Sequence, residues 1–211
     1  MTIWEAALVA AAVAILGGYH VHFFFQLRRS PRATTVGRAR QHRRAWVEGI
    51  VERHDGILAI QTLRNWSMSA SFLASTAVII AAGLLGFMFS AEKTSTLIHQ
   101  FNLLGSQGLP LLSFKLILLI GDFLATFFSF SLCLRYYNYV ALTINTPPGD
   151  DAEEIAMLSA DYLELAASHF TLGMRGYYLS IPLALWLFGP IWLALGSLGL
   201  TVVLYRHDHV V

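Results

Sequence analysis

The stretch RRSPRATTVGRARQHRR at residues 28–44 decides how this chain of 211 residues is built. It lies between two long apolar runs. The connection between these runs holds nine of the fourteen basic residues: Arg28, Arg29, Arg32, Arg38, Arg40, Arg43, Arg44, Arg53 and Arg64. In membrane proteins, Lys and Arg concentrate in the short loops that stay in the cytoplasm. The stretch therefore predicts a membrane protein whose first connection lies inside the cell.

The composition supports a membrane protein of all-α fold. Only 13% of the residues are charged and 56% are hydrophobic, whereas about a quarter of an ordinary soluble domain is charged. Crossing a hydrocarbon core about 30 Å thick takes roughly 20 helical residues. Four apolar stretches are long enough, at about residues 3–25, 66–90, 111–134 and 177–204. We predict a single integral membrane domain over residues 1–211, with four transmembrane helices and both termini outside (periplasmic).

Two cytoplasmic amphipathic helical segments are predicted between these spans, at residues 27–65 and 138–175. The first is basic over residues 38–53 and either lies in the lipid headgroup plane or packs on other cytoplasmic helices. The second is acidic over residues 150–164, so we expect the two segments to dock. Gly189-Pro190, near the centre of the fourth span, predicts a kink, because proline there leaves the carbonyl of Trp186 without its helical donor.

Polar residues within the spans are the sharpest functional signal. Lys115 and Asp122 are seven residues apart, about 20° short of two helical turns, so they share a face. A charge at this depth costs at least a few kcal/mol unless it is paired or hydrated. The stripe therefore predicts a polar path, or else a lysine that reaches the interface and an aspartate bonded to a neighbouring helix. The candidate path comprises Lys115, Asp122, Thr126, Ser129, Ser67, Ser71 and Ser75.

The serines at positions 67, 71 and 75 have a second interpretation, because small residues at four-residue steps are typical of a helix-packing seam. A separate group lies at the cytoplasmic ends of the spans: Arg64, Asn65, Arg135 and Arg175. These residues are candidates for binding lipid phosphates or another anion, or they merely anchor the helix ends. A net charge of +1 argues against a nucleic-acid partner.

The histidines do not predict a cofactor. A bis-histidine haem between His169 and either His20 or His22 is conceivable, but nothing in their spacing demands one. His207 and His209 have a spacing that could hold a metal ion, although a solvated tail is the commoner case. We find no phosphate-cradling glycine loop, serine elbow or zinc-protease motif, so we do not expect an enzyme.

Several motifs resemble an uncharacterised membrane family, domain of unknown function 599. They are GILAIQTLRN at 56–65 with the following stretch 69–82, INTPP at 144–148 and LFGP at 187–190. The family has bacterial and plant members. The resemblance implies a four-pass membrane protein, and it implies no activity or catalytic site. We expect the chain in a bacterial inner (plasma) membrane.

The function we predict is a channel or transporter for a small solute or ion. Four helices seldom enclose a roomy path, so we expect a homo-oligomer surrounded by membrane lipids. The alternatives are an accessory or assembly subunit of a larger membrane complex, and a lipid- or haem-binding membrane protein. The substrate cannot be deduced from these residues.

Overall fold

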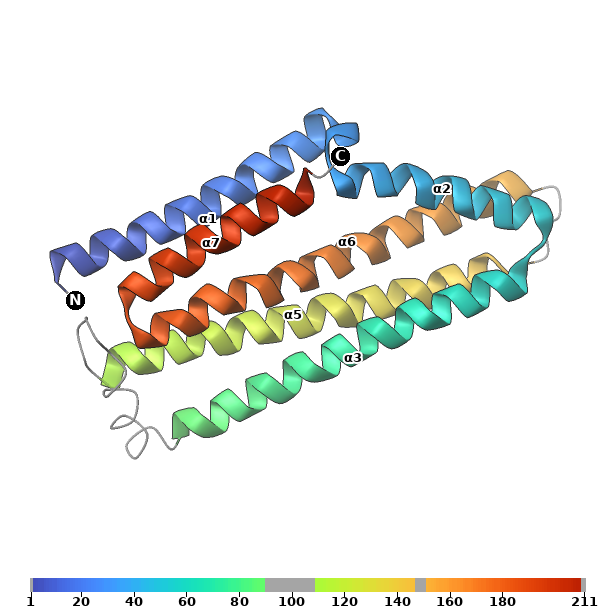
Figure 1. The fold of residues 1–211 in the computed structure, drawn as a ribbon. Helices are drawn as coiled ribbons and strands as arrows, with labels where there is room; N and C mark the ends of the chain where they lie inside the picture. The colour runs from blue at the N-terminus through green and yellow to red at the C-terminus, as the bar shows by residue number, and fades with distance from the viewer. Residues whose placement is uncertain (1, 90–108, 147–150, 210–211) are drawn as a thin grey trace.

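A computed structural model describes residues 2–89, 109–146 and 151–209 of the chain, and these residues are almost entirely helical (Figure 1). The all-α prediction is confirmed for these ranges. Within them, six α-helices and two short 3-10 turns follow one another: α1 (Ile3–Arg29), η1 (Pro31–Ala33), α2 (Thr35–Arg53), α3 (Gly56–Phe89), α5 (Leu109–Thr143), α6 (Ala152–Leu185), η2 (Trp186–Phe188) and α7 (Pro190–Asp208).

Local residue choices shape the arginine-rich connection between α1 and α3. Pro31 follows the end of α1 and cannot continue its hydrogen-bond ladder. Thr34 then caps α2, because its hydroxyl accepts a bond from the Gly37 backbone N–H at 3.1 Å. α2 ends at Arg53, and the next residue, His54, adopts the left-handed conformation with φ 53°. The chain can therefore turn back into α3 within two residues.

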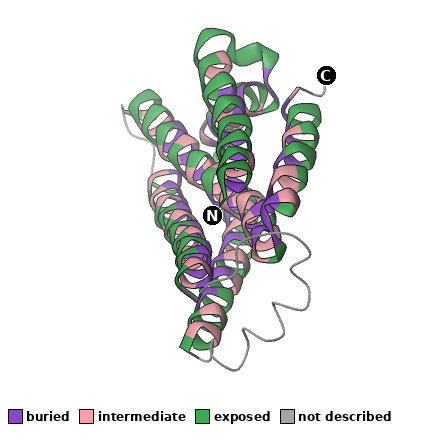
Figure 2. Cartoon of the chain, turned by 90° about the vertical axis from the view of Figure 1, so that its left-hand side faces the viewer, coloured by how far each residue is buried: buried purple, intermediate pink, exposed green. Residues whose placement is uncertain are grey.

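α6 lies between α5 and α7, α3 lies beside α5, and α1 lies beside α7 (Figure 1). The main core forms where α3, α5 and α6 meet, around Ala70, Phe130 and Leu163. A second core joins α1 to α7 through Phe23 and Leu200. Viewed from the end of the bundle, buried residues face inward and exposed residues cover the outside (Figure 2).

Among the described residues, three helices are long and apolar enough to cross a membrane: α1, α3 and residues Pro110–Thr143 of α5. Their outer faces carry large exposed apolar side chains, such as Val21, Phe72 and Phe128. Large exposed apolar surfaces are typical of a face that contacts a membrane or a partner. By length and composition these helices fit a membrane protein, whereas the predicted count of four spans is not confirmed.

The predicted fourth span over residues 177–204 is wrong as a single helix. α6 ends at Leu185, and the chain reverses through η2 and Gly189 into α7 (Figure 1). Gly189 has φ 137° and ψ 163°, a conformation essentially restricted to glycine. Pro190 then starts α7, where its missing N–H costs nothing. α7 returns along α6, so that a Cβ added to Gly196 would lie 3.3 Å from the Cα of Pro182. The expected kink is a full reversal.

This reversal also contradicts the prediction that both termini lie on the same side. Ala12 of α1 packs with Leu193 near the start of α7, and Tyr19 bonds Asp208 at its end. α1 and α7 are therefore parallel, and the first and last described residues, Thr2 and His209, lie at opposite ends of the bundle (Figure 1).

The two predicted cytoplasmic segments are only partly separate from the spans. α2 is a helix of its own, but residues 56–65 belong to α3, residues 138–143 to α5 and residues 152–175 to α6. α3, α5 and α6 have 34 or 35 residues, so each is about 50 Å long. They extend about 20 Å beyond a 30 Å hydrocarbon core. α2 packs on this extension through Val47 and Ile50, as the second of the two predicted alternatives requires.

Candidate functional site: a buried arginine near the arginine-rich end

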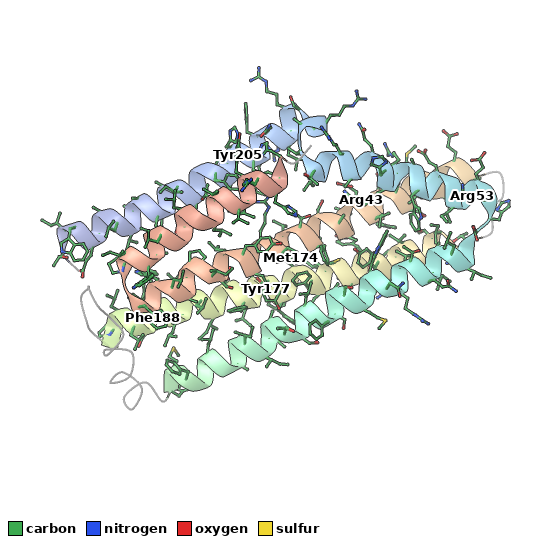
Figure 3. The ribbon with its side chains drawn as sticks, in the orientation of Figure 1. Arg43, Arg53, Met174, Tyr177, Phe188 and Tyr205 are labelled. Carbon is green, nitrogen blue, oxygen red and sulfur yellow. The ribbon has the colours of Figure 1, made fainter. Side chains whose placement is uncertain are left out.

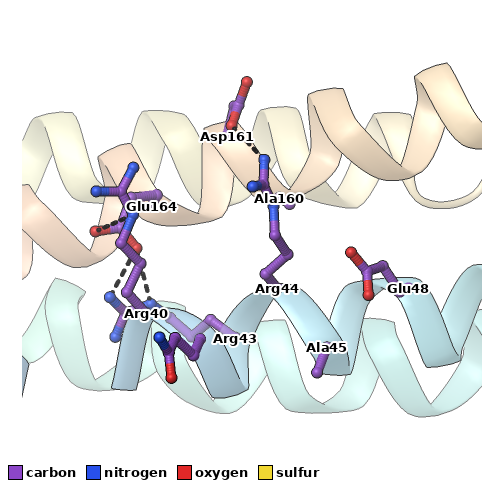
Figure 4. Close-up of a pocket in the computed structure, with 9 residues that line it drawn as sticks. Arg40, Arg43, Arg44, Ala45, Glu48, Ala160, Asp161 and Glu164 are labelled. Atoms are coloured by element: carbon purple, nitrogen blue, oxygen red, sulfur yellow. Dashed lines mark hydrogen bonds and ion pairs between the residues drawn. The ribbon is translucent and has the colours of Figure 1, made fainter. Parts of the chain in front are cut away.

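Ion pairs join α2 to α6, as the opposite charges of these segments predict (Figure 4). The closest pair joins Arg43 Nη2 to Glu164 Oε2 at 2.7 Å, and Arg40 Nε lies 3.8 Å from the other oxygen of Glu164. Arg44 Nη2 lies 3.6 Å from Asp161 Oδ1. The side chains of Arg40, Arg44 and Asp161 are more than half exposed, so these two pairs contribute about 1 kcal/mol or less each. The Arg43–Glu164 pair is the shielded one.

A second charged cluster is buried where α1, α6 and α7 meet. Arg175 Nη2 on α6 lies 2.6 Å from Asp208 Oδ2 on α7, and their side chains are only 8% and 6% exposed. The Tyr19 hydroxyl on α1 donates to the same carboxylate oxygen. The guanidinium carbon of Arg175 lies 3.9 Å from the centroid of the Phe23 ring. Arg175, Asp208 and Tyr19 therefore connect α6, α7 and α1 through one carboxylate group.

Arg175 has donors that the protein does not satisfy. A guanidinium carries five N–H donors, yet the Nε and Nη1 atoms of Arg175 are buried without a hydrogen-bond partner. Arg175 also lines a cavity of about 310 Å³ between α2, α6 and α7. Arg43 and Thr35 line it from α2, Tyr178 from α6, and His207 from α7. The cavity combines two basic side chains with an otherwise mainly apolar lining.

Lys115 and Asp122 lie on one face of α5 as predicted, but in different environments. Lys115 is 5% exposed, and its Nζ donates to the backbone carbonyl of Trp186 at 2.9 Å. The same carbonyl accepts from the Gly189 backbone N–H at 3.1 Å, so Lys115 is a second donor at the turn between α6 and α7. Asp122 is half-buried, and its Oδ2 atom has no partner. The alternative in which a neighbouring helix satisfies Asp122 is therefore not seen.

Thr126 follows Asp122 by one turn and is also buried with an unpaired Oγ1. A Cβ added to Gly176 of α6 would lie only 2.0 Å from this hydroxyl, so α5 and α6 approach closely here. Ser129 is half-buried, and its hydroxyl donates to the Ala125 carbonyl at 2.9 Å. The predicted polar residues of α5 thus lie on one helix. Among them, Asp122 Oδ2 and Thr126 Oγ1 are buried without a hydrogen-bond partner.

The predicted serine stripe on α3 is not brought to this face. Ser67 is half-buried, and Ser71 and Ser75 are exposed. The buried face of α3 is formed mainly by alanines instead: Ala59, Ala70, Ala74, Ala77 and Ala81. Within one copy, the serines therefore neither form the packing seam nor line a path with Asp122.

The predicted group of arginines at the helix ends does not form one site. Arg64 and Asn65 are exposed on α3. Arg135 is exposed on α5, where its Nε donates to the Tyr139 hydroxyl at 2.8 Å. Arg175 alone of this group is buried. Arg64 and Arg135 thus have the positions of surface anchors, while Arg175 has the position of an interior binding group.

The histidines are engaged separately. His209 Nε2 lies 2.6 Å from Gln26 Oε1, and its Nδ1 lies 3.0 Å from the Tyr205 carbonyl. Both of its ring nitrogens are therefore occupied, which disfavours a metal site with His207. His169 stacks on Tyr136, and burial lowers the pKa of its imidazole. Among the described residues, no group of three or more His, Cys, Asp or Glu could hold a metal ion.

The buried Arg175–Asp208–Tyr19 cluster is not among the sites predicted from the sequence. Asp208 lies between His207 and His209 in the polar segment that follows the predicted fourth span, where the apolar pattern indicates no buried partner. A signal does exist in the buried face of α7, whose residues recur every three or four positions and end at Asp208: Leu193, Ser197, Leu200, Leu204 and Asp208. This spacing places Asp208 on the buried face of the last helical turn.

A family model described as "Protein of unknown function, DUF599" matches residues 7–211. The match covers nearly the whole chain, so this chain belongs to that family, as the motif resemblance predicts. Comparison with curated proteins and with solved structures gave no match.

Proposed function

We propose that this member of a family of unknown function passes a small ion or solute across a membrane as an assembly of several copies. The observation that carries the proposal is the carboxylate of Asp122, whose Oδ2 is buried without a partner in an apolar span. Ionisable residues inside membrane helices usually mark ion pathways or proton relays. Thr126, one turn away, offers a second unpaired oxygen on the same face.

The serine stripe supports an assembly rather than a pore within one chain. Ser71 and Ser75 are exposed on the outer face of α3, away from the α5–α6 contact that holds Thr126. Small hydroxyl residues on a membrane helix allow close approach and hydrogen bonding by another helix. A neighbouring copy could therefore cover this face and contribute polar groups that a single chain does not bring together.

Asp122 is the group to which we assign contact with the passing ion. A carboxylate exchanges protons or coordinates small cations, so the proposed substrate class is a proton, a small cation or a solute that carries one. Lys115 has a different role in this proposal. Its ammonium group is engaged by the Trp186 carbonyl, so it positions the α6–α7 turn.

The rival function is an accessory or assembly subunit of a larger membrane complex. That function needs no pathway and predicts that Lys115 and Asp122 are both dry and paired. Lys115 meets this expectation, whereas the Oδ2 atom of Asp122 does not. The unpaired oxygen is why we prefer passage of an ion or solute.

Flux measurements in proteoliposomes test the proposal. Wild-type protein, Asp122→Asn and Asp151→Asn are reconstituted at equal density, and proton and potassium flux are recorded under an imposed membrane potential. Asp151→Asn is a matched control, because it makes the same chemical change at an exposed carboxylate near the start of α6. The proposal predicts flux in the wild type and the control and its loss in Asp122→Asn. Equal flux in all three, or no flux in the wild type, would overturn it.

A further inference from the structure

The cavity beside Arg175 has the properties of a binding site that the proposed pathway does not use. Its central feature is the buried guanidinium, of which Nη2 bonds Asp208 while Nε and Nη1 have no acceptor. Leaving such donors unsatisfied is unfavourable, and more so when the group is charged. An acceptor supplied by a ligand would remove this penalty. Arg175 lines the cavity, while its Nε and Nη1 atoms are themselves covered, so a ligand in the cavity would bond them after a shift of the guanidinium.

The charges around the cavity favour an anion. Arg175 on α6 and Arg43 on α2 line it, and Asp208 is the carboxylate among the lining residues. One oxygen of Asp208 is already held by both Tyr19 and Arg175. Glu164, which pairs with Arg43 at 2.7 Å, does not line the cavity. The lining thus carries two guanidinium groups and one carboxylate, a net charge of +1, with Arg175 paired to Asp208 and Arg43 paired to Glu164 just outside the cavity.

The size and the apolar part of the site indicate an amphiphilic ligand. A neighbouring cavity of about 380 Å³ shares Arg43, Phe170 and Thr171 with the cavity of about 310 Å³. The second cavity continues along aromatic side chains, Trp66 and Tyr137. Small-molecule sites typically have about 300–1,000 Å³. A ligand with a charged end at Arg175 and an apolar remainder would fit this arrangement.

The depth of Arg175 along the bundle matches that of a lipid headgroup. Phe23 of α1 covers Arg175, and α1 ends six residues later at Arg29, which is exposed like its neighbour Arg28. Six helical residues span about 9 Å, similar to the headgroup layer that borders the hydrocarbon core. In Figure 3, Arg43 lies on the side of α2 that faces α6, whereas Arg53 lies at the far end of α2. The distance of about 9 Å from Phe23 to the end of α1 thus places the site beside the predicted membrane surface.

We propose that this cavity binds the phosphate group of a phospholipid or of a soluble phosphate compound, and that Arg175 is the residue that holds the phosphate. Arginine suits this role because its planar guanidinium offers several donors to phosphate oxygens at once. Arg43 lies at the α2 side of the cavity and contributes a second positive charge. The apolar lining receives the remainder of the ligand. This site is independent of the pathway proposed at Asp122.

Binding to delipidated protein in mild detergent tests the proposal. Thermal unfolding is followed while the protein is titrated with short-chain phosphatidylglycerol, with the diacylglycerol of the same chains, or with inorganic phosphate. The proposal predicts that phosphatidylglycerol raises Tm and that diacylglycerol does not. A similar rise with inorganic phosphate alone would assign the site to soluble phosphate compounds. No rise with either phosphate ligand, or equal rises with phosphatidylglycerol and diacylglycerol, would overturn the proposal.

Variants then assign the effect to Arg175. Arg175→Lys keeps the charge but loses the planar donor group, so phosphatidylglycerol should bind about tenfold more weakly or worse. The double variant Arg175→Gln/Asp208→Asn removes both buried charges together, which avoids leaving one unpaired, and should show the same loss. Arg53→Lys is the matched control, because Arg53 is an exposed arginine at the far end of α2. Equal weakening by Arg53→Lys, or unchanged binding in both Arg175 variants, would contradict the assignment.

Discussion

The substitution Asp208→Asn tests whether the buried ion pair holds α7 against α1 and α6. Asp208 Oδ2 accepts from Arg175 at 2.6 Å and from the Tyr19 hydroxyl, and both charged side chains are more than nine-tenths buried. Removing one partner of a buried pair costs about 3–5 kcal/mol, because the other charge is left buried and uncompensated. Asparagine still offers one acceptor oxygen, so we expect the lower value, about 3 kcal/mol.

The expected loss is measurable by thermal unfolding in detergent, followed by tryptophan fluorescence. For a chain of this length, 1 kcal/mol corresponds to roughly 2–4 °C in Tm, so Asp208→Asn should lower Tm by about 6–12 °C. Asp161→Asn is the control, since Asp161 forms an exposed pair with Arg44 at 3.6 Å. An exposed pair contributes about 1 kcal/mol or less, so Asp161→Asn should lower the stability by no more than that.

A double-mutant cycle separates the ion pair from other effects of the substitution. Because Arg175→Gln and Asp208→Asn disrupt the same contact, the double variant should be less destabilised than the sum of the two single variants. A Tm of Asp208→Asn equal to that of Asp161→Asn, or strictly additive single effects, would refute the assignment of a shared buried contact.

Three further substitutions follow from the packing. Gly189→Ala should lower stability by about 1–3 kcal/mol, because φ 137° is strained for any side chain. Gly176→Ala should destabilise the α5–α6 contact by about 1–3 kcal/mol, since its Cβ would lie 2.0 Å from Thr126 Oγ1. Lys115→Met should cost about 1 kcal/mol, because it removes the donor 2.9 Å from the Trp186 carbonyl, which keeps the Gly189 N–H at 3.1 Å. The loss of stability in each variant is measured as a decrease in Tm in the same detergent.

Gly199→Ala is the matched control for the two glycine substitutions. Gly199 is helical and has nothing within 4 Å of an added Cβ, so alanine there should leave Tm unchanged or raise it slightly. If Gly199→Ala and Gly176→Ala lowered Tm equally, the loss in Gly176→Ala would not come from the close approach of α5 and α6. For Lys115→Met, a wild-type Tm would contradict its role at the α6–α7 turn.

The long helices were predictable because they rest on local patterns that persist over many residues. The apolar runs that form α1, α3 and α5 are long enough to indicate membrane helices by their length and composition. The docking of α2 on α6 was also predictable, because opposite charges on two amphipathic segments favour contact. Arg43 and Glu164 form the ion pair that this pattern requires.

The reversal at Gly189 was not predictable from the apolar pattern, which continues unbroken on both sides of Gly189-Pro190. Gly-Pro suits a kink and a tight turn equally well. Contacts remote in sequence accompany the turn, since Leu193 packs on Ala12 and Lys115 donates to Trp186. A single helix over residues 177–204 would hold Asp208 far from Arg175, so the buried ion pair does not follow from that prediction.

Part of the candidate pathway followed from helical periodicity alone. Lys115 and Asp122 share a face because seven residues make nearly two turns, and both lie on α5. Periodicity does not predict which groups of a neighbouring helix pack against that face. The contact of Lys115 with Trp186 and the unpaired Oδ2 of Asp122 depend on how α6 and η2 pack against α5.

The reversal at Gly189 makes the number of passages along the bundle odd, and every contact of α7 depends on it. To test it, the same topology reporter is placed before Thr2 in one protein and after His209 in another, and both proteins are expressed in cells. We predict that the two reporters lie on opposite sides of the membrane, with the C-terminal reporter on the side of the arginine stretch at residues 28–44. Finding both reporters on the same side would contradict the reversal.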